Sequence, residues 1–509
     1  MSRVFYTRTM GEVLDDCRRA WRMLTGRRKY DAAKINRLTA DWTTISKSAD
    51  YDIEQDLGIL RARSRQLCEN YDYGKRFMDL IETHVIGSGG IMLQSKVKTA
   101  AGKLDKPVND AIEAAWKDFC RKGNCTSDGQ LTMREVVKLA AQALARDGEP
   151  LIQLLRGRGP HGLLLKPLDS DFLDHTYTDT RLRIRMGVEI DQEGRPTAYH
   201  LLREHPGDRF FISMARDRRR VPAAEIIHFF NRERAQQTRG VPWTRTAMRR
   251  MHMTGKYEET ELVAARVSAA KMGFFVNANG QPFPYDDKDA KGNLISEVSP
   301  GHLGQLPPGW DFRPFDPEHP NAGFEAFVKA VLRGAAAGLN ISYATLTGDL
   351  RDVNFSSIRH GVMEERDAWK IFQQAMIDHV LDPVFREWLP QAVAFGKLDL
   401  PFADLEQYIS PYWQPRRWAW VDPLKDVQAK VTAIANKLES RSDTISETGR
   451  DPEEVFAKIE EEEARLGPAA GPAQKLVSGG EGDASDGQGS DQNGKILSYS
   501  QFGSGGRRR

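Results

Sequence analysis

Residues 243–270 carry the longest uninterrupted helical pattern before the C-terminal third, and this feature constrains the fold most. The stretch has no proline and one glycine, Gly255, so it predicts a single helix of roughly 40 Å at about 1.5 Å per residue. Its apolar residues are interleaved with arginine, lysine and glutamate. A second helical pattern, at 324–339, follows only after an interruption that is rich in glycine, proline and aspartate.

The interruption and the second helix differ in composition. Within residues 277–322, the segment 294–315 predicts two or three short strands. The second helix ends in a run of small residues from Gly334 to Gly338, which allows two backbones to pack closely. A polar loop at 342–356 follows, and a helical pattern then runs from 356 to 395 with one interruption at Pro383.

The N-terminal half mixes helices with strands, so we expect an α+β fold. The helical segments are 53–86, 111–120 and 131–149, and the turn 87–90 separates the first of them from a strand. Thr132 and Glu135 have the spacing of a capping box at the start of the last segment. Between 150 and 230, short apolar or alternating runs separated by Gly, Pro and Asp predict a mostly antiparallel sheet.

The C-terminal part changes character twice. Residues 396–422 are rich in aromatic residues and proline, and residues 423–466 return to a helical pattern. From 467 to 509 the composition is dominated by Gly, Ser, Asp, Gln and Ala. Such a tail cannot bury enough apolar surface to fold, so we expect it to be disordered.

Composition limits the classes of protein to which the chain can belong. Its 73 basic and 71 acidic residues leave a net charge of +2, whereas a dedicated DNA reader is usually more basic because phosphate neutralisation dominates its affinity. Four cysteines in 509 residues make no disulfide framework, and Cys120 and Cys125 lack zinc-knuckle spacing. No signal peptide or long apolar run is present. We expect a soluble protein made in a reducing cytoplasm, without metal or cofactor.

Catalytic motifs are mostly missing, so we expect no enzyme. No Gly-Lys pair continues into a phosphate-binding loop, and the patterns HExxH and GxSxG are absent. The stretch DSDFLDH (169–175) gathers three aspartates and a histidine. It leaves a metal-dependent nuclease as an alternative, with Asp171 as the residue to test. A turn in which aspartates cap their own backbone is the simpler interpretation.

Two arginine runs leave a further alternative, a nucleic-acid-binding adaptor. They are RDRRR (216–220) and the terminal RRR (507–509). We interpret the first as the solvated edge of a hairpin. For the second, an electrostatic tether to DNA or to a scaffold stays open.

The polar loop at 342–356 is as rich in polar and charged residues as an active site. No further set of catalytic residues in the sequence completes such a site. Its polar side chains, with those of the first turn beyond it, are Thr347, Asp349, Arg351, Asp352, Asn354, Ser356, Ser357 and Arg359. The one histidine nearby in sequence, His360, falls a turn into the next helix. Capping of that helix by Asn354 or Ser356 explains the loop more simply than catalysis does.

Five stretches in order resemble the portal proteins of tailed bacteriophages, specifically the lambda-like portal family. They are RARSRQLCENYDYGKRFMDLIETHVIGSGGIMLQ (61–94), RDGEPLIQL (146–154), VPAAEIIHFF…RAQQTRGVPW (221–243), AARVSAAKMGFF (264–275) and GLNISYATLTGDLRDVNFSSIR (338–359). In the last stretch Phe355 stands where the family usually has tyrosine, which keeps the ring. The resemblance covers about residues 40–460.

The resemblance implies a portal fold with named parts. These would be an N-terminal arm (1–52), a mixed helix and sheet wing (53–242), a first stem helix (243–276), a β-rich clip (277–322), a second stem helix (323–341), a tunnel loop (342–356), a long wing or crown helix (357–400), a helical crown (401–466) and the disordered tail (467–509).

The resemblance also implies a function. The chain would form a ring of about twelve copies at one capsid vertex, the head–tail connector through which double-stranded DNA is packaged and ejected. Expected partners are the terminase, which carries the ATPase in this family, head-completion and tail proteins, capsid and scaffold, with no membrane. The protein would belong to the virion and assemble in the cytoplasm of the bacterial host. DNA would pass the loop residues Thr347, Asp349, Arg351, Asp352, Asn354, Ser356 and Arg359. It would also pass the stem residues Arg249, Arg250, Lys256, Arg266 and Lys271.

The charges of the loop suit a channel wall, which must touch DNA without gripping it. Strong cationic contacts would multiply around a ring, and six to ten of them already give roughly a thousandfold or greater salt sensitivity in affinity. We expect Arg351 and Asn354 to make transient contacts with the DNA backbone, while Asp349 and Asp352 prevent these contacts from lasting. The alternative is a loop that only packs against neighbouring subunits.

Overall fold

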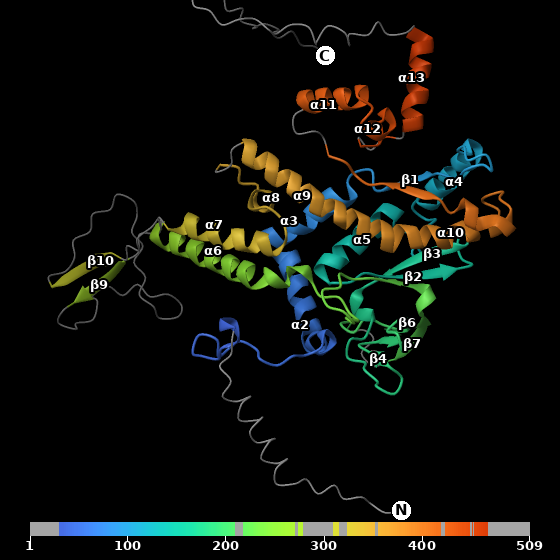
Figure 1. The fold of residues 1–509 in the computed structure, drawn as a ribbon. Coiled ribbons are helices and arrows are strands. Elements are labelled where there is room, and N and C mark those ends of the chain that lie inside the picture. The colour runs from blue at the N-terminus through green and yellow to red at the C-terminus, as the bar shows by residue number, and fades with distance from the viewer. Residues whose placement is uncertain are drawn as a thin grey trace, which may run out of the picture. The chain divides into compact units, whose positions relative to one another are not determined.

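A computed structural model describes most of the chain. The described residues are 30–208, 217–269, 273–277, 309–314, 323–351, 355–418, 423–447, 450 and 452–466. The chain divides into two compact units, Met1–Val431 and Thr432–Arg509. Helices and antiparallel strands are mixed in the first unit, in agreement with the predicted α+β class (Figure 1).

The first predicted helix is broken in two. α2 (Ala49–Asn70) and α3 (Asp72–Ile81) stand in place of the single helix predicted over 53–86, and a π-helical turn, Glu82–Ile86, follows. No glycine or proline stands at the break, Tyr71. Instead, the Tyr71 hydroxyl lies 2.6 Å from His252 Nδ1 of a distant helix. A tertiary contact accompanies a boundary that helical periodicity does not show.

The next helices form as the sequence predicts. They are α4 (Lys106–Phe119) and α5 (Met133–Arg146). The capping box of α5 is confirmed, because Thr132 Oγ1 accepts a hydrogen bond from Glu135 N at 3.3 Å and Glu135 Oε2 accepts one from Thr132 N at 2.8 Å. These bonds satisfy two amides that the first turn would otherwise leave without partners.

The strands between 150 and 230 pair antiparallel, as predicted. One sheet has the order β3–β2–β8 and another has the order β4–β5–β6–β7. Their bounds are β2 (Leu151–Arg156), β3 (Leu163–Leu168), β4 (Ile184–Arg185), β5 (Val188–Ile190), β6 (Pro196–Leu202), β7 (Arg218–Pro222) and β8 (Ile226–His228). The central strand β2 is buried over its first four residues.

The RDRRR run is the edge strand that the sequence predicts. β7 is the last strand of its sheet, and Arg216 lies outside the described residues. Arg218 forms an ion pair with Asp174 at 2.6 Å, and Arg220 forms one with Glu189 at 2.8 Å. Carboxylates of the same chain already pair with these two cations, which weighs against the adaptor alternative.

The long helix after the polar loop continues through Pro383 and contains a second proline, Pro390. α9 (Phe355–Met376) leads through a π-helical turn, Ile377–Leu381, into α10 (Asp382–Ala394). Pro383 has no amide hydrogen and its ring crowds the carbonyl four residues earlier, so the wider π turn lets the helix pass without ending. The predicted interruption is therefore a local widening. α10 then buries Trp388 fully, with its ring 5.0 Å from that of Trp116.

The range 401–466, predicted to be one helical crown, is divided in the structure. β11 (Pro411–Gln414) pairs antiparallel with β1 (Met92–Ser95), with Trp413 opposite Leu93. Trp413 belongs to the main hydrophobic core of the first unit. The reason is aromatic burial, which ties this proline-rich segment to α4 and α10 instead of leaving it helical. Helices return in α11 (Pro423–Ala435), α12 (Arg441–Glu447) and α13 (Pro452–Leu466).

His84 joins three segments that are far apart in the sequence. Its Nδ1 accepts a hydrogen bond from Trp418 Nε1 at 3.0 Å and lies 3.1 Å from Arg416 Nη1. Its ring stacks on Trp369 of α9, with the centroids 5.3 Å apart. Burial and the Arg416 charge lower the pKa of His84 to about 4.

We expect the stability of the chain to fall as the pH drops from about 6.5 to about 4. In this window the unfolded chain protonates His84 near its ordinary pKa of 6.5, whereas the folded chain keeps it neutral down to about 4. The folded state therefore binds fewer protons, and acid favours unfolding. Thermal unfolding across this range should show a smaller loss in His84→Gln, which keeps an acceptor that does not titrate. Equal losses in variant and wild type would contradict this role.

The cysteines that the structure describes are free thiols, as the sequence predicts. Cys68 and Cys125 are buried free thiols, and burial raises the pKa of each to about 12. Cys120 is also a free thiol, whereas Cys17 lies outside the described residues. Among the helices that the structure describes, none has the length and apolar character needed to cross a membrane.

Candidate functional site: the α6–α7 helix pair and the segment leading to α9

The two long helices predicted at the start pack against each other. They are α6 (Met248–Ala269), preceded by a 3-10 turn, and α7 (Phe324–Gly338) (Figure 1). A Cβ on Gly334 would lie 2.5 Å from Arg250 Nη1, and one on Gly338 would lie 2.9 Å from Thr246 Oγ1. The Thr246 hydroxyl donates to the Gly338 carbonyl at 2.7 Å. The small-residue run therefore allows close packing, as predicted, and its partner lies in the same chain.

Replacing Ala336 with leucine should lower the free energy of unfolding by about 1–3 kcal/mol through overpacking. Ala336 is 1% exposed and belongs to the main core, so the added carbons have no free volume. The matched control is Ala337→Leu, one position further along α7, where the side chain is exposed. Urea unfolding of both variants is the measurement. Equal effects in the two would show that the run is not tightly packed.

The strands of the predicted clip are described only in part. β9 (Gly273–Asn277) follows α6, and β10 (Trp310–Pro314) pairs with it antiparallel. β10 falls within the segment for which short strands were predicted. Residues 278–308 and 315–322 lie outside the described residues.

The basic residues predicted for the stem lie along α6. Arg249, Arg250, Lys256 and Arg266 are exposed, and Lys271 lies outside the described residues. Lys256 forms an ion pair with Glu259 at 2.8 Å on the same helix. Arg250 instead lies over Gly334 of α7.

The polar loop is partly helical. α8 (Tyr343–Thr347) begins where Ser342 Oγ accepts a hydrogen bond from Thr345 N at 3.1 Å, and it ends at Gly348 with φ +73°. Ser342 supplies an N-cap that the sequence analysis overlooked. The Thr345 hydroxyl donates to Glu365 Oε2 at 2.8 Å, which ties α8 to α9. This short helix corrects the expectation of an irregular loop.

The remaining predicted loop residues divide into three groups. Thr347 closes α8, where its hydroxyl donates to the Tyr343 carbonyl at 2.8 Å. Asp352 and Asn354 lie outside the described residues, so the expected capping by Asn354 does too. Ser356, Ser357 and Arg359 fall in the first turns of α9.

Asp349 and Arg351 are held together against α7. Arg351 Nε and Nη2 donate to the two oxygens of Asp349 at 2.9 and 3.0 Å, and Arg351 Nη2 lies 3.0 Å from Glu325 Oε1. Lys329 Nζ lies 4.0 Å from Asp349 Oδ2. Hydrogen bonds from Arg351 hold the pKa of Asp349 well below its ordinary value. One exposed guanidinium thus lies between two carboxylates, beside a groove of about 480 Å³.

A buried charge cluster around Glu149 is the feature that sequence reasoning missed. Glu149 and the guanidinium groups of Arg61 and Arg239 are at most 1% exposed. Both arginines donate to Glu149 Oε1, and His228 Nε2 lies 2.9 Å from Oε2. Burial alone would raise the pKa of Glu149, but the two arginine charges outweigh it and hold the pKa well below its ordinary value.

Three of the five recognised stretches meet at this cluster. Arg61 comes from the first stretch, Glu149 from RDGEPLIQL, and Arg239 and Gly240 from TRGVPW. The Gly240 amide donates to Glu149 Oε2 at 2.8 Å. A Cβ on Gly240 would lie 2.1 Å from the Gly148 carbonyl oxygen, so only glycine fits. These stretches therefore maintain the fold at this point.

The DSDFLDH stretch contributes to the same network. Arg65 donates to Asp171 Oδ2 at 2.6 Å and to Asp169 Oδ1 at 2.8 Å. Asp169 Oδ1 also accepts from the Asp171 amide at 2.8 Å, which confirms the predicted self-capped turn. His205 joins these two aspartates in a group whose possible ligand atoms lie within 4.8 Å of one another. Because guanidinium groups already neutralise both carboxylates, the geometry favours an ion-pair network over a metal site.

Replacing Asp171 with asparagine should lower the free energy of unfolding by about 1–3 kcal/mol, because charged hydrogen bonds to Arg61 and Arg65 are lost. The same loss is expected with and without MgCl₂ or MnCl₂ in the buffer. Thermal unfolding with each salt is the measurement, with the exposed Asp110→Asn as the control. A metal-dependent rise in melting temperature that disappears in Asp171→Asn would favour the nuclease alternative.

Known proteins similar to this chain are phage portal proteins. Residues 36–373 match the family described as phage portal protein, lambda family. The "Probable portal protein" of Halomonas phage phiHAP-1 is 36% identical over 86% of this chain and 87% of its own length. "Portal protein B" of Escherichia phage lambda is 24% identical over 86% of this chain and 90% of its own. The chain therefore belongs to the lambda family of phage portal proteins.

Among solved structures, the chain is similar to chains from gene transfer agent particles. One, from the neck of a native particle computed with C12 symmetry, covers 77% of this chain and 94% of its own, at 13% identity and a TM-score of 0.42. Another, from the neck of an empty particle, has 14% identity and a TM-score of 0.43.

Proposed function

We propose that this chain is a structural protein that forms the portal at one vertex of a phage capsid. About twelve copies make a ring, and double-stranded DNA passes through its channel during packaging and ejection. The observation that carries this proposal is family membership over residues 36–373, which include the strands β2 to β8, α6, α7 and most of α9. Such a ring belongs to the virion after assembly in the bacterial cytoplasm.

Family membership also supports proposals for the stem, clip, wing and crown of the portal. α6 and α7 form the stem, with Arg249, Arg250, Lys256, Arg266 and Lys271 near the path of the DNA. The β9–β10 region forms the clip, which meets the terminase and later the head-completion and tail proteins. Residues 53–242 form the wing, and the helices after about 423 form the crown towards capsid and scaffold.

The ring is tested first by mass and shape. The full-length chain should give assemblies of about 690 kDa for twelve copies of the 57.4-kDa chain in native mass spectrometry. Negative-stain images of the same sample should show rings with a central hole. A stable monomer or dimer that cleaves DNA when a divalent metal is added would overturn the proposal in favour of a nuclease.

The segment 342–356 lines the channel in this proposal. Arg351 and Asn354 make brief contacts with DNA phosphates, and Asp349 and Asp352 limit how long these contacts last. Support comes from the Arg351 guanidinium, which lies between Asp349 and Glu325. A cation that already has carboxylate partners offers a phosphate group little net attraction.

The loop proposal is tested by removing one of the two carboxylates that pair with this cation. Rings of Asp349→Asn should retain double-stranded DNA more strongly at low salt than wild-type rings, with a steeper dependence on salt concentration, because only Glu325 then competes with a phosphate group for Arg351. Asp367→Asn, which removes an exposed partner of Lys370 on α9, is the matched control. Filter binding across a salt series is the measurement. Identical retention by wild-type and Asp349→Asn rings would show that the loop only packs against neighbouring subunits.

A further inference from the structure

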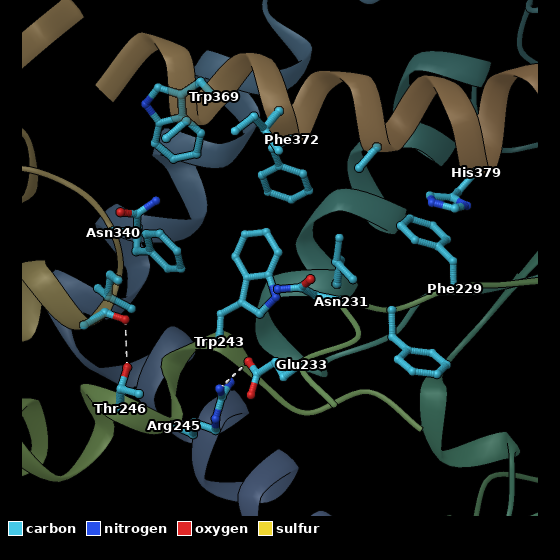
Figure 2. A pocket seen from close by; sticks show the side chains of 18 residues that line it. Phe229, Asn231, Glu233, Trp243, Arg245, Thr246, Asn340, Trp369, Phe372 and His379 are labelled. Atoms are coloured by element: carbon cyan, nitrogen blue, oxygen red, sulfur yellow. Dashed lines mark hydrogen bonds and ion pairs between the residues drawn. The ribbon is translucent and has the colours of Figure 1, made fainter. Parts of the chain in front are cut away.

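An apolar pocket of about 470 Å³ lies between the 3-10 turn that precedes α6, the end of α7, and α9. Figure 2 shows Trp243 facing Phe372, and the two ring centroids are 4.7 Å apart. Phe229 stacks on His379 further along the pocket. Ile371 at the rim is 74% exposed. The Trp243 indole Nε1 is buried and has no hydrogen-bond partner within the described residues.

The segment before α2 has the complementary property. Its large apolar side chains point into solvent, each at least 60% exposed: Tyr30, Ile35, Leu38, Trp42 and Ile45. The segment nevertheless has local order. The Leu38 amide donates to Asn36 Oδ1 at 2.8 Å, and the Thr39 hydroxyl donates to the Lys34 carbonyl at 2.7 Å. Charged residues such as Arg37 and Asp41 are exposed there too. Even so, five large apolar side chains exposed on one short, internally hydrogen-bonded segment favour a surface that covers them.

The end of this segment next to α2 is hydrogen-bonded to another part of the same chain. Arg234 Nη2 donates to the Lys47 carbonyl, and the Thr238 hydroxyl donates to Asp50 at 2.6 Å. The apolar side chains of residues 30–45 lie in solvent and not in the pocket of the same chain. A single chain thus exposes both an unoccupied apolar pocket and an uncovered apolar segment.

We propose that residues 30–45 of one copy occupy the Trp243 pocket of the neighbouring copy. The inference rests on the proposed ring. A ring is built from head-to-tail contacts between unlike surfaces, and each copy then supplies one segment and one pocket. The partner is therefore a second copy of this chain. Trp42 or Leu38 fills the aromatic pocket.

Cysteine crosslinking between two differently tagged chains tests the proposal. One chain carries Asp41→Cys, an exposed position beside Trp42 that leaves both apolar anchors in place, and the other carries Ile371→Cys, both in a background with Cys17→Ser. The remaining cysteines are buried or half-buried. The chains are mixed before assembly, treated with a short bismaleimide and separated on a denaturing gel. A mixed covalent dimer is expected, severalfold more abundant than with Leu182→Cys, which is 59% exposed outside the pocket.

The other outcomes overturn the proposal in distinguishable ways. A link that forms only inside a chain carrying both cysteines would mean that the segment folds back onto its own pocket. Rings that are visible in images but show no mixed dimer would leave the portal proposal intact and reject this contact. Equal dimer yield with Leu182→Cys would show that the contact is unspecific. A chain that stays monomeric in images would reject both the ring and the contact.

Discussion

Replacing Glu149 with alanine lowers the free energy of unfolding by about 3–5 kcal/mol, the cost of leaving a buried charge without its partner. The carboxylate lies between Arg61 and Arg239, and all three side chains are at most 1% exposed. Its removal leaves two guanidinium groups in a site that water does not reach. Urea unfolding followed by circular dichroism measures the loss. If the variant is too unstable to purify, Glu149→Gln, which keeps the size and one acceptor, should still be destabilised.

The matched control is an ion pair of the same residue types at the surface. Arg156 Nε lies 2.7 Å from Glu387 Oε2, and both side chains are about one-third exposed. Glu387→Gln should cost about 0–1 kcal/mol, because solvent screens the pair. Equal losses at Glu149 and Glu387 would show that the buried cluster has no special part in stability.

Replacing Gly148 with alanine should lower the free energy of unfolding by about 2–5 kcal/mol, from a strained backbone angle together with overpacking. Gly148 has φ +94°, and an added Cβ would lie 2.5 Å from the Val241 carbonyl carbon. The backbone of 240–241 would have to move, and the Gly240 hydrogen bond to Glu149 would move with it. Thermal and urea unfolding measure the effect.

Gly123→Ala separates the two causes. Gly123 has φ +91°, almost the same angle, but a Cβ added there would meet no atom within 4 Å. This variant should lose only the conformational part, about 1–2 kcal/mol. The difference in the loss of unfolding free energy between Gly148→Ala and Gly123→Ala measures the cost of crowding residues 240–241 against position 148. Equal losses would show that segment 240–241 adapts without cost.

Local patterns predicted the elements whose causes are local. The helices α4 to α7, the capping box at Thr132 and the antiparallel pairing of β2 to β8 all follow from spacing, caps and turn residues. The edge position of β7 follows from its run of arginines. These features depend on residues a few positions apart, which a single sequence displays directly.

Elements whose boundaries depend on distant partners were predicted incorrectly. The break at Tyr71 carries no local signal, and its hydroxyl meets His252 from α6. β11 formed where a helical crown was expected, because Trp413 packs into a core contributed by other segments. α8 lies inside the predicted loop and is tied to Glu365 of α9. In the first two cases the deciding contact joins residues that are far apart in the sequence, whereas α8 begins at a local cap, Ser342, that the sequence analysis overlooked.

The candidate site was only partly predictable for the same reason. The sequence located Asp349 and Arg351 and suggested that they offset each other, and the structure brings them within hydrogen-bond distance. It did not indicate that Glu325 of α7 is a second partner of the arginine.

The sequence by itself determined the family, the class of fold and the long helices, because motif order and helical spacing are properties of the linear chain. Only the tertiary structure decided what the motifs are for. Arg61, Glu149 and Arg239 lie in three separate stretches, and nothing in their spacing shows that they share one buried site. Burial decides their role, because a charge removed from water must find its partner within the protein, wherever in the chain that partner lies.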